Sequence, residues 1–145
     1  MKIYFDMDGT LANLYDVDDW RAKLIMGDNS PYLEAKPMVN MSLLARHLNR
    51  LRKSGYQIGI VTWLSMGSTP QYDKAVREAK KIWLAKHLPS VVFDEIHMVQ
   101  YGRNKNDIVK DNSGILFDDD ERNRSKWKGT SYDETQIMEV LKGLF

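Results

Sequence analysis

The first residues of the chain already indicate its fold, and they read Lys2-Ile3-Tyr4-Phe5-Asp6-Met7-Asp8-Gly9-Thr10-Leu11. A short apolar run ends in two carboxylates, which is typical of a buried β-strand that leads into a tight turn. Ligands of open α/β sheets bind beyond the carboxyl ends of the strands, so Asp6 and Asp8 are expected where a ligand binds. Two acids this close repel each other, which favours a cation between them or a proton on one of them. A plainer interpretation, with Asp8-Gly9 as a simple turn and Asp6 as a helix cap, stays open at this point.

The composition is that of an ordinary globular chain. Its 145 residues suffice for one hydrophobic core, so we expect a single domain over residues 1–145. The net charge of +1 argues against a broad basic surface for nucleic acid but does not exclude a local groove. The absence of cysteine excludes disulfides, thiolate metal ligands and a thiol nucleophile. Since no signal-like start or membrane-length apolar stretch is present, we expect a soluble, cytoplasmic protein without a membrane partner.

Residues 11–37 form the least regular part of the chain. Gly27-Asp28-Asn29-Ser30-Pro31 interrupts a helical spacing of apolar residues, and the position after the first strand predicts a small insert above the strand ends. The aromatic residues Tyr15, Trp20 and Tyr32 either pack a small core of the insert or face a ligand.

Two long helices flank a second strand. The first helix is expected to open at Pro37 and to end at Ser54-Gly55. Residues 57–61 predict a buried strand that delivers Thr62 to its carboxyl end, where a hydroxyl and loop amides can meet a phosphate. The second helix is expected over residues 71–87, with an apolar side of Ala75, Ala79, Ile82, Trp83 and Leu88 and an outer side of Lys74, Arg77, Lys80, Lys81 and Lys86. We interpret this basic side as solvated, with a nucleic-acid-facing surface as the alternative.

A lysine and three acids accompany the last predicted strands. Residues 93–99 predict a third strand, and the glycine turn after it sets Lys105 near the start of a short helix, with Arg103 and Lys110 as alternatives. Residues 114–117 predict a fourth strand that runs into three aspartates, which repel one another unless a cation lies against them. The register favours Asp118 and Asp119 at the strand end, and it leaves Asp120 as a helix cap. A short edge strand is expected within residues 127–132, and a last helix is expected after Asp133.

Strands that alternate with helices predict an α/β fold, a three-layer doubly wound parallel sheet with a small cap insert at about residues 11–37. Right-handed crossovers bring the carboxyl end of every strand to the same edge of the sheet. We therefore expect one cleft to gather Asp6, Asp8, Thr62, Lys105, Asp118 and Asp119.

These segments resemble the motifs of the haloacid dehalogenase-like (HAD) superfamily, most of whose members are magnesium-dependent phosphohydrolases. Asp6-Met7-Asp8-Gly9-Thr10 resembles the first motif, the strand ending in Thr62 the second, Lys105 the third and Asp118-Asp119 the fourth. The resemblance implies that Asp6 is the nucleophile, that Asp8 is the general acid/base, and that Thr62 and Lys105 bind the phosphate. It also implies Mg²⁺, held by Asp6, the backbone carbonyl of Asp8, Asp118 and, through water, Asp119, because oxygen ligands suit this ion.

The substrate class follows from narrower resemblances. The segment order is similar to that of the 5'(3')-deoxyribonucleotidase group, although the insert is shorter than the cap usual there. Other stretches resemble the phosphatase domain of phage polynucleotide kinase: Pro37-Met38-Val39, Gly55-Tyr56-Gln57-Ile58 and Asn106-Asp107-Ile108-Val109-Lys110. These resemblances imply a phosphomonoesterase that acts through an aspartyl-phosphate on a small phosphorylated substrate, a nucleotide, with base stacking on Tyr15, Trp20 or Trp63. The alternative is a polynucleotide 3'-phosphatase that acts on nucleic-acid ends, and a third hypothesis is a non-catalytic HAD-like binding module.

Overall fold

The structure, a computed structural model, describes residues 1–109 and 111–145, so Lys110, one alternative for the phosphate-binding base, lies outside the described residues. A five-stranded sheet in the order β5-β4-β1-β6-β7 forms its centre, and every neighbouring pair in this sheet is parallel. In chain order the elements are β1 (Lys2–Phe5), β2 (Ala12–Asn13), η1 (Leu14–Asp16), α1 (Trp20–Ile25), α2 (Ser30–Glu34), β3 (Lys36–Pro37), α3 (Met41–Lys53), β4 (Gln57–Trp63), α4 (Pro70–His87), β5 (Glu95–Val99), α5 (Lys105–Ile108), β6 (Ile115–Phe117), α6 (Glu121–Lys126), β7 (Thr130–Tyr132), η2 (Glu134–Gln136) and α7 (Ile137–Gly143).

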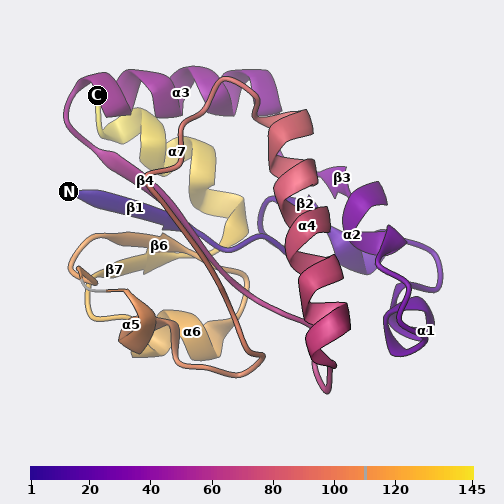
Figure 1. Cartoon of the computed structure of the whole chain (residues 1–145). Helices are drawn as coiled ribbons and strands as arrows, with labels where there is room; N and C mark the ends of the chain where they lie inside the picture. Colours follow the sequence, from indigo (N-terminus) through magenta and orange to yellow (C-terminus); the bar gives the residue numbers. More distant parts are fainter. Residues whose placement is uncertain (110) are drawn as a thin grey trace.

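Helices cover both faces of the sheet. Figure 1 shows α3 and α7 together on one face, with α5 and α6 on the other. Alternate residues of a strand point to opposite faces, so Ile3 and Phe5 join the core under α3 and α7, whereas Tyr4 packs with Leu116 and Trp127 on the other side. The sheet is therefore buried on both faces, as parallel sheets usually are.

The first long helix starts later than the sequence predicts. Pro37 does not open it: Lys36–Pro37 pairs antiparallel with Ala12–Asn13, and α3 begins at Met41. The side chain of Asn40 accepts a hydrogen bond from the amide of Leu43, so Asn40 caps the helix and sets its start. The predicted end is confirmed, because the chain leaves the helix at Ser54 and Gly55 has a φ of +100°.

The insert at residues 12–37 is held against α4. Its two short strands, β2 and β3, form a separate sheet, and α1 and α2 lie between them in sequence. The indole of Trp83 donates to the carbonyl of Ala35 at 2.7 Å, and the hydroxyl of Tyr72 donates to the carbonyl of Asp28 at 2.9 Å. Both donors lie on α4, so this helix connects the insert to the main sheet (Figure 1).

Among the helices in the described ranges, none is both long and apolar enough to cross a membrane.

Candidate active site

The turn after β1 places two acids at the carboxyl edge of the sheet. The amide of Asp6 continues the β1–β6 pairing by donating to the carbonyl of Phe117 at 2.9 Å. The amides of Leu11 and Ala12 then both donate to the carbonyl of Met7, which closes a tight turn. Asp6 is therefore fixed by the sheet and is not a helix cap, which contradicts the plainer interpretation of this stretch.

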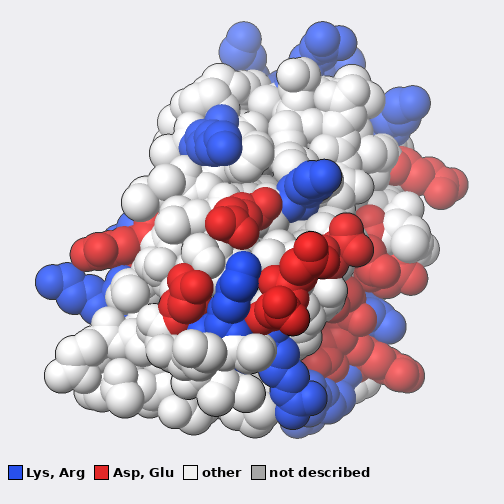
Figure 2. All heavy atoms as spheres, turned by 90° about the vertical axis from the view of Figure 1, so that its right-hand side faces the viewer, with Lys and Arg blue, Asp and Glu red and all other residues white. Residues whose placement is uncertain are grey.

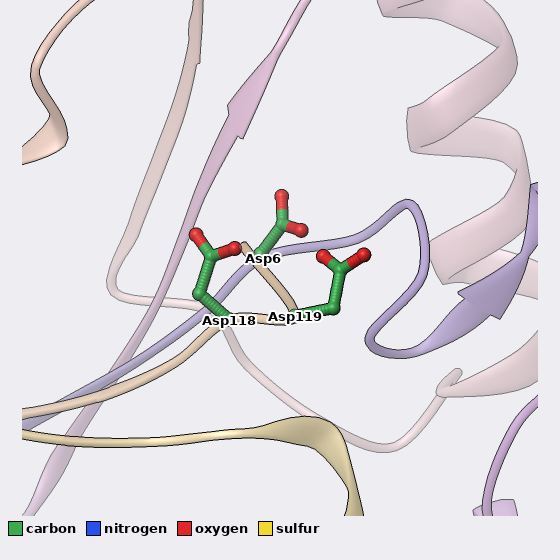
Figure 3. A group of neighbouring side chains, drawn as sticks. All are labelled: Asp6, Asp118 and Asp119. Carbon is green, nitrogen blue, oxygen red and sulfur yellow. The ribbon is translucent and has the colours of Figure 1, made fainter. Parts of the chain in front are cut away.

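Three carboxylates meet at this edge. Oxygen atoms of Asp6, Asp118 and Asp119 all lie within 4.8 Å of one another, and Figure 3 shows the three carboxyl groups on the same side of the backbone. The hydroxyl of Thr10 lies 3.2 Å from Asp6 Oδ2 and 3.3 Å from Asp119 Oδ1, and it accepts the amide of Asp119 at 3.1 Å. Burial, together with the charge of Asp6, raises the pKa of Asp118 and of Asp119 well above the ordinary range of aspartate. The cluster is thus short of positive charge.

Asp120 stands apart from this cluster. Its side chain accepts the amide of Arg122 and caps α6, as the sequence predicts, and it also pairs with the Arg122 guanidinium at 2.7 Å. Of the acids after β6, Asp118 and Asp119 are therefore the two that face Asp6.

Lys105 lies between two of the acids. Its Nζ donates to Asp6 Oδ1 at 2.9 Å and to Asp118 Oδ2 at 2.7 Å, and the residue is 1 % exposed. Burial lowers the pKa of Lys105, but the two carboxylates outweigh this effect and raise it, so the amine is charged. Arg103, the alternative in the described chain, is exposed, and its carbonyl accepts the indole N–H of Trp63.

A second buried lysine, Lys80, was wrongly predicted to lie on the outer side of its helix. It is 1 % exposed, and its Nζ donates to Asp8 Oδ2 at 2.9 Å and to Thr62 Oγ1 at 2.8 Å. Ile82, which was predicted on the apolar side, is instead 57 % exposed. The helix is thus rotated relative to the prediction, and Lys80 shares a face with Val76 and Leu84, one turn before and one turn after it. That spacing is the signal that sequence reasoning missed.

A cleft of about 370 Å³ opens over these residues. Asp6, Asp8, Lys105, Asp118 and Asp119 line it, so the structure brings five of the six predicted site residues together. Thr62 does not line the cleft, because its side chain is fully buried, and it contacts the site through Lys80. Aromatic side chains line it as well. They are Tyr15, Trp20 and Tyr32 of the insert, and Trp63 and Tyr101 of the main body.

The aromatic residues of the insert divide between the two roles that the sequence left open. Tyr32 is buried in a cluster with Leu14 and Tyr72, so it is mainly a packing residue. Tyr15 is 52 % exposed and forms an edge-on pair with Trp20 at a centroid distance of 5.0 Å. Trp63 and Tyr101 form a tilted pair at 4.9 Å. Two aromatic pairs, one from the insert and one from the main body, therefore line the same cleft.

The charges of the site fit a divalent cation. Four carboxylates, those of Asp6, Asp8, Asp118 and Asp119, face two ammonium groups, those of Lys80 and Lys105. With all of them ionised, two negative charges remain unbalanced. Hard oxygen ligands with this excess charge suit Mg²⁺, and the chain contains no cysteine that would favour zinc.

The surface around the site is mixed in charge. Figure 2 shows the side of the molecule that bears the insert and α4, with Lys and Arg side chains interleaved with Asp and Glu. Basic side chains are not gathered there into one continuous surface, which agrees with the net charge of +1.

Solved structures confirm the predicted α/β fold class. D,D-heptose 1,7-bisphosphate phosphatase from Burkholderia thailandensis has a TM-score of 0.51 and 14% identity, over 86% of this chain and 69% of that one. The D,D-heptose 1,7-bisphosphate phosphatase from B. bronchiseptica, complexed with magnesium and phosphate, has a TM-score of 0.51 and 17% identity, over 87% of this chain and 74% of that one. No protein-family model and no curated protein matches the sequence significantly.

Proposed function

We propose that this chain is a Mg²⁺-dependent phosphomonoesterase that acts through an aspartyl-phosphate intermediate on nucleotides. One observation carries the proposal: the buried Asp6 lies at a sheet edge with Asp118, Asp119 and the ammonium group of Lys105. The fold shared with two phosphatases, one of them solved with magnesium and phosphate, supports it.

Asp6 is the proposed nucleophile. One of its carboxylate oxygens attacks phosphorus, and the bond from phosphorus to the leaving oxygen breaks with its electron pair going to that oxygen. The leaving oxygen takes the proton of Asp8 and departs as an alcohol. Asp8 then removes a proton from water while the water oxygen attacks phosphorus. The bond between phosphorus and Asp6 breaks, and inorganic phosphate leaves with Asp6 restored.

The other polar groups offset the negative charge of the phosphate. Asp6 and one phosphate charge repel each other by about 4 kcal/mol at 4 Å in a medium of effective dielectric 20. We propose that Lys105 and Thr62 bind the phosphate oxygens and that Asp6, Asp118, Asp119 and the backbone carbonyl of Asp8 hold Mg²⁺. When bound, the ion would supply the positive charge that this acid cluster lacks.

The aromatic lining supports a nucleotide substrate. A nucleobase can stack on aromatic side chains through either of its faces, and this cleft offers Tyr15 with Trp20 and Trp63 with Tyr101. We propose that residues 11–37 act as a small cap on a single hydrolase domain over residues 1–145. The polynucleotide 3'-phosphatase remains the second candidate, because such a small cap leaves room for a strand end.

Phosphate release tests the proposal. We would measure it with Mg²⁺ and with EDTA on an aryl phosphate, on 5'- and 3'-mononucleotides and on a 3'-phosphorylated oligonucleotide. Asp6→Asn should lose all measurable release, while Asp18→Asn, an exposed acid of the insert, should behave as wild type. EDTA should abolish release on every substrate, and Mg²⁺ should restore it.

The outcomes separate the candidates. Preference for mononucleotides supports the proposed substrate, whereas a strong preference for the oligonucleotide favours the 3'-phosphatase. Activity in Asp6→Asn would remove the nucleophile. Binding of Mg²⁺ without release from any substrate would favour a non-catalytic binding module.

A further inference from the structure

Lys80 is a charged residue that the reaction proposed above does not use. It comes from the middle of α4, is 1 % exposed and has three partners: Asp8 Oδ2 at 2.9 Å, Thr62 Oγ1 at 2.8 Å and the carbonyl of Trp63 at 2.8 Å. An ammonium group has three donors and no acceptor, so these contacts use its full capacity. Burial of a charge is costly unless it is paired and hydrogen-bonded. All three of the groups that pair with it belong to the candidate site or its walls.

The contact with Thr62 fixes the direction of a hydroxyl proton. Lys80 can only donate, so Thr62 Oγ1 must accept in this bond. The hydroxyl proton of Thr62 is then free to point elsewhere. Thr62 lies one residue before the end of β4, near the edge where Asp6 and Lys105 lie, and its side chain is fully buried and does not line the cleft.

The contact with Lys80 gives the two carboxylate oxygens of Asp8 different environments. Lys80 occupies Oδ2, whereas Oδ1 has no hydrogen-bond partner among residues 1–109 and 111–145. The proton that Asp8 delivers to a leaving group is therefore best carried on Oδ1, because Oδ2 faces an ammonium group. Lys105 pairs with Asp6 and Asp118, whereas the carboxylate partner of Lys80 is Asp8 and not the proposed nucleophile.

We propose that Lys80 is a positioning residue, anchored on the buried Thr62, that aims one proton donor, the Oδ1–H of Asp8, at the leaving oxygen of the phosphate ester. This inference rests on the proposed phosphomonoesterase function. Lys80 itself does not touch the substrate in this arrangement and acts through Asp8.

The dependence of the rate on the leaving group tests this role. An alkyl phosphate needs its leaving oxygen protonated, whereas the nitrophenolate of p-nitrophenyl phosphate departs without a proton. Lys80→Met should lower kcat/KM, which reports the step in which the leaving group departs, at least about 100-fold more on the alkyl ester than on p-nitrophenyl phosphate, since general acid catalysis contributes at least that factor. A residue that only stabilises the fold would lower both rates equally. The matched control is Lys74→Met, an exposed lysine of the same helix, which should change neither rate.

Two further variants keep the test decisive if Lys80→Met folds poorly. Lys80→Gln retains a neutral donor and should keep part of the alkyl phosphatase activity. In an Asp8→Asn background, Lys80→Met should not further lower the rate on the alkyl ester relative to the rate on p-nitrophenyl phosphate. The acid that Lys80 positions is already absent from that background. This double variant also leaves no unpaired charge between the two positions.

Each result decides between the hypotheses. An active wild type whose Lys80→Met variant loses both rates equally, or neither, overturns the positioning role and leaves the proposed function intact. The positioning role is also overturned if Lys80→Met, in the Asp8→Asn background, further lowers the rate on the alkyl ester relative to the rate on p-nitrophenyl phosphate. A wild type that is inactive on both esters with Mg²⁺ overturns the proposed function and this inference with it.

Discussion

Gly9 is the residue at which the backbone and the acid cluster meet. It has a φ of +80°, and a Cβ atom there would lie 2.2 Å from Asp119 Oδ2 and 2.9 Å from Tyr15 Cε2. Two separate constraints therefore require glycine at this position: the left-handed backbone conformation and the close approach of the Asp119 carboxylate.

A pair of substitutions separates these reasons. Gly27 has nearly the same φ, +81°, but nothing lies within 4 Å of its would-be Cβ. Gly27→Ala should cost about 1–2 kcal/mol from backbone strain alone. Gly9→Ala should cost about 1–3 kcal/mol more, since a crowded side chain must move, and phosphate release should fall at least about tenfold. Urea unfolding in EDTA measures the stability costs of Gly9→Ala and Gly27→Ala, and steady-state assays measure phosphate release. Equal costs at both positions would show that Asp119 yields without strain.

Single residues also show where sequence reasoning succeeded and failed. Asp6 and Asp118 were predictable because each follows directly on an apolar strand, where the chain has little freedom. Lys80 was missed, because lysine on a helix is normally solvated and the acceptors of its amine lie 18 and 72 positions away in sequence. Only its spacing from Val76 and Leu84 indicated the buried face of the helix. Thr10 was missed as well, since its contacts with Asp119 join residues 109 positions apart that the pairing of β1 with β6 brings together.

At the scale of elements, Glu95 ties β5 to β1, the strand on the far side of β4. This side chain accepts from Lys2 at 2.8 Å, from the hydroxyl of Tyr4 at 2.8 Å and from His97 at 2.9 Å. Burial raises the pKa of Glu95, but these hydrogen bonds prevail and lower the pKa from 4.5 to about 2. The folded state therefore binds this proton more weakly than the unfolded state does.

The acid sensitivity of stability should consequently depend on Glu95. Its contribution is present above pH 4.5 and is lost as the pH falls toward 2, because the pKa is lower in the folded state. Between pH 6 and pH 3, wild type should lose about 1–2 kcal/mol more unfolding free energy than Glu95→Gln, which cannot titrate. Urea unfolding at both pH values measures the difference, with Glu78→Gln on the exposed side of α4 as the control. Parallel losses in wild type and Glu95→Gln would contradict the assignment.

The insert supports a second prediction at this scale. Tyr15 is half-exposed, lines the cleft and lies close to Gly9. If a nucleobase stacks on it, Tyr15→Leu should raise KM for a mononucleotide about tenfold, since stacking contributes about 1–3 kcal/mol per base. KM for a small alkyl phosphate without a base should not change. A shift that is the same for both substrates would mean that Tyr15 acts on the phosphate site and not on the base.

The start of α3 shows why element boundaries were harder to predict than elements. Proline favours the first turn of a helix, which made Pro37 a reasonable start. In the fold, however, Lys36–Pro37 must pair with Ala12–Asn13 to close the insert, and this pairing is not visible in the local sequence. Long-range pairing thus overrides local preference at this position.

At the scale of the whole molecule, the sheet converts distant sequence positions into one site. A parallel sheet was predictable from the alternation of strands and helices. In the structure, β1 pairs with β4 and β6, which brings residues 6, 62 and 118 to one edge. The contribution of α4 was not predictable in the same way. Its rotation about its own axis is set by packing of Val76, Trp83 and Leu84 against the insert and the sheet core.

The unbalanced charge of the assembled site leads to the last prediction. Four buried or half-buried carboxylates face two ammonium groups, so Mg²⁺ should stabilise the folded chain relative to EDTA by mass action, about 2.7 kcal/mol at a hundredfold excess over Kd. Asp119→Asn should reduce this Mg²⁺-dependent gain in Tm, because Asp119 belongs to the cluster. The matched control is the adjacent Asp120→Asn, which should keep the α6 cap, because asparagine caps a helix as well as aspartate does, and should keep the full response to Mg²⁺. Thermal unfolding with Mg²⁺ and with EDTA measures both effects. A full Mg²⁺ response in Asp119→Asn together with its loss in Asp120→Asn would move the second acidic ligand to Asp120 and contradict the geometry of the three-carboxylate cluster.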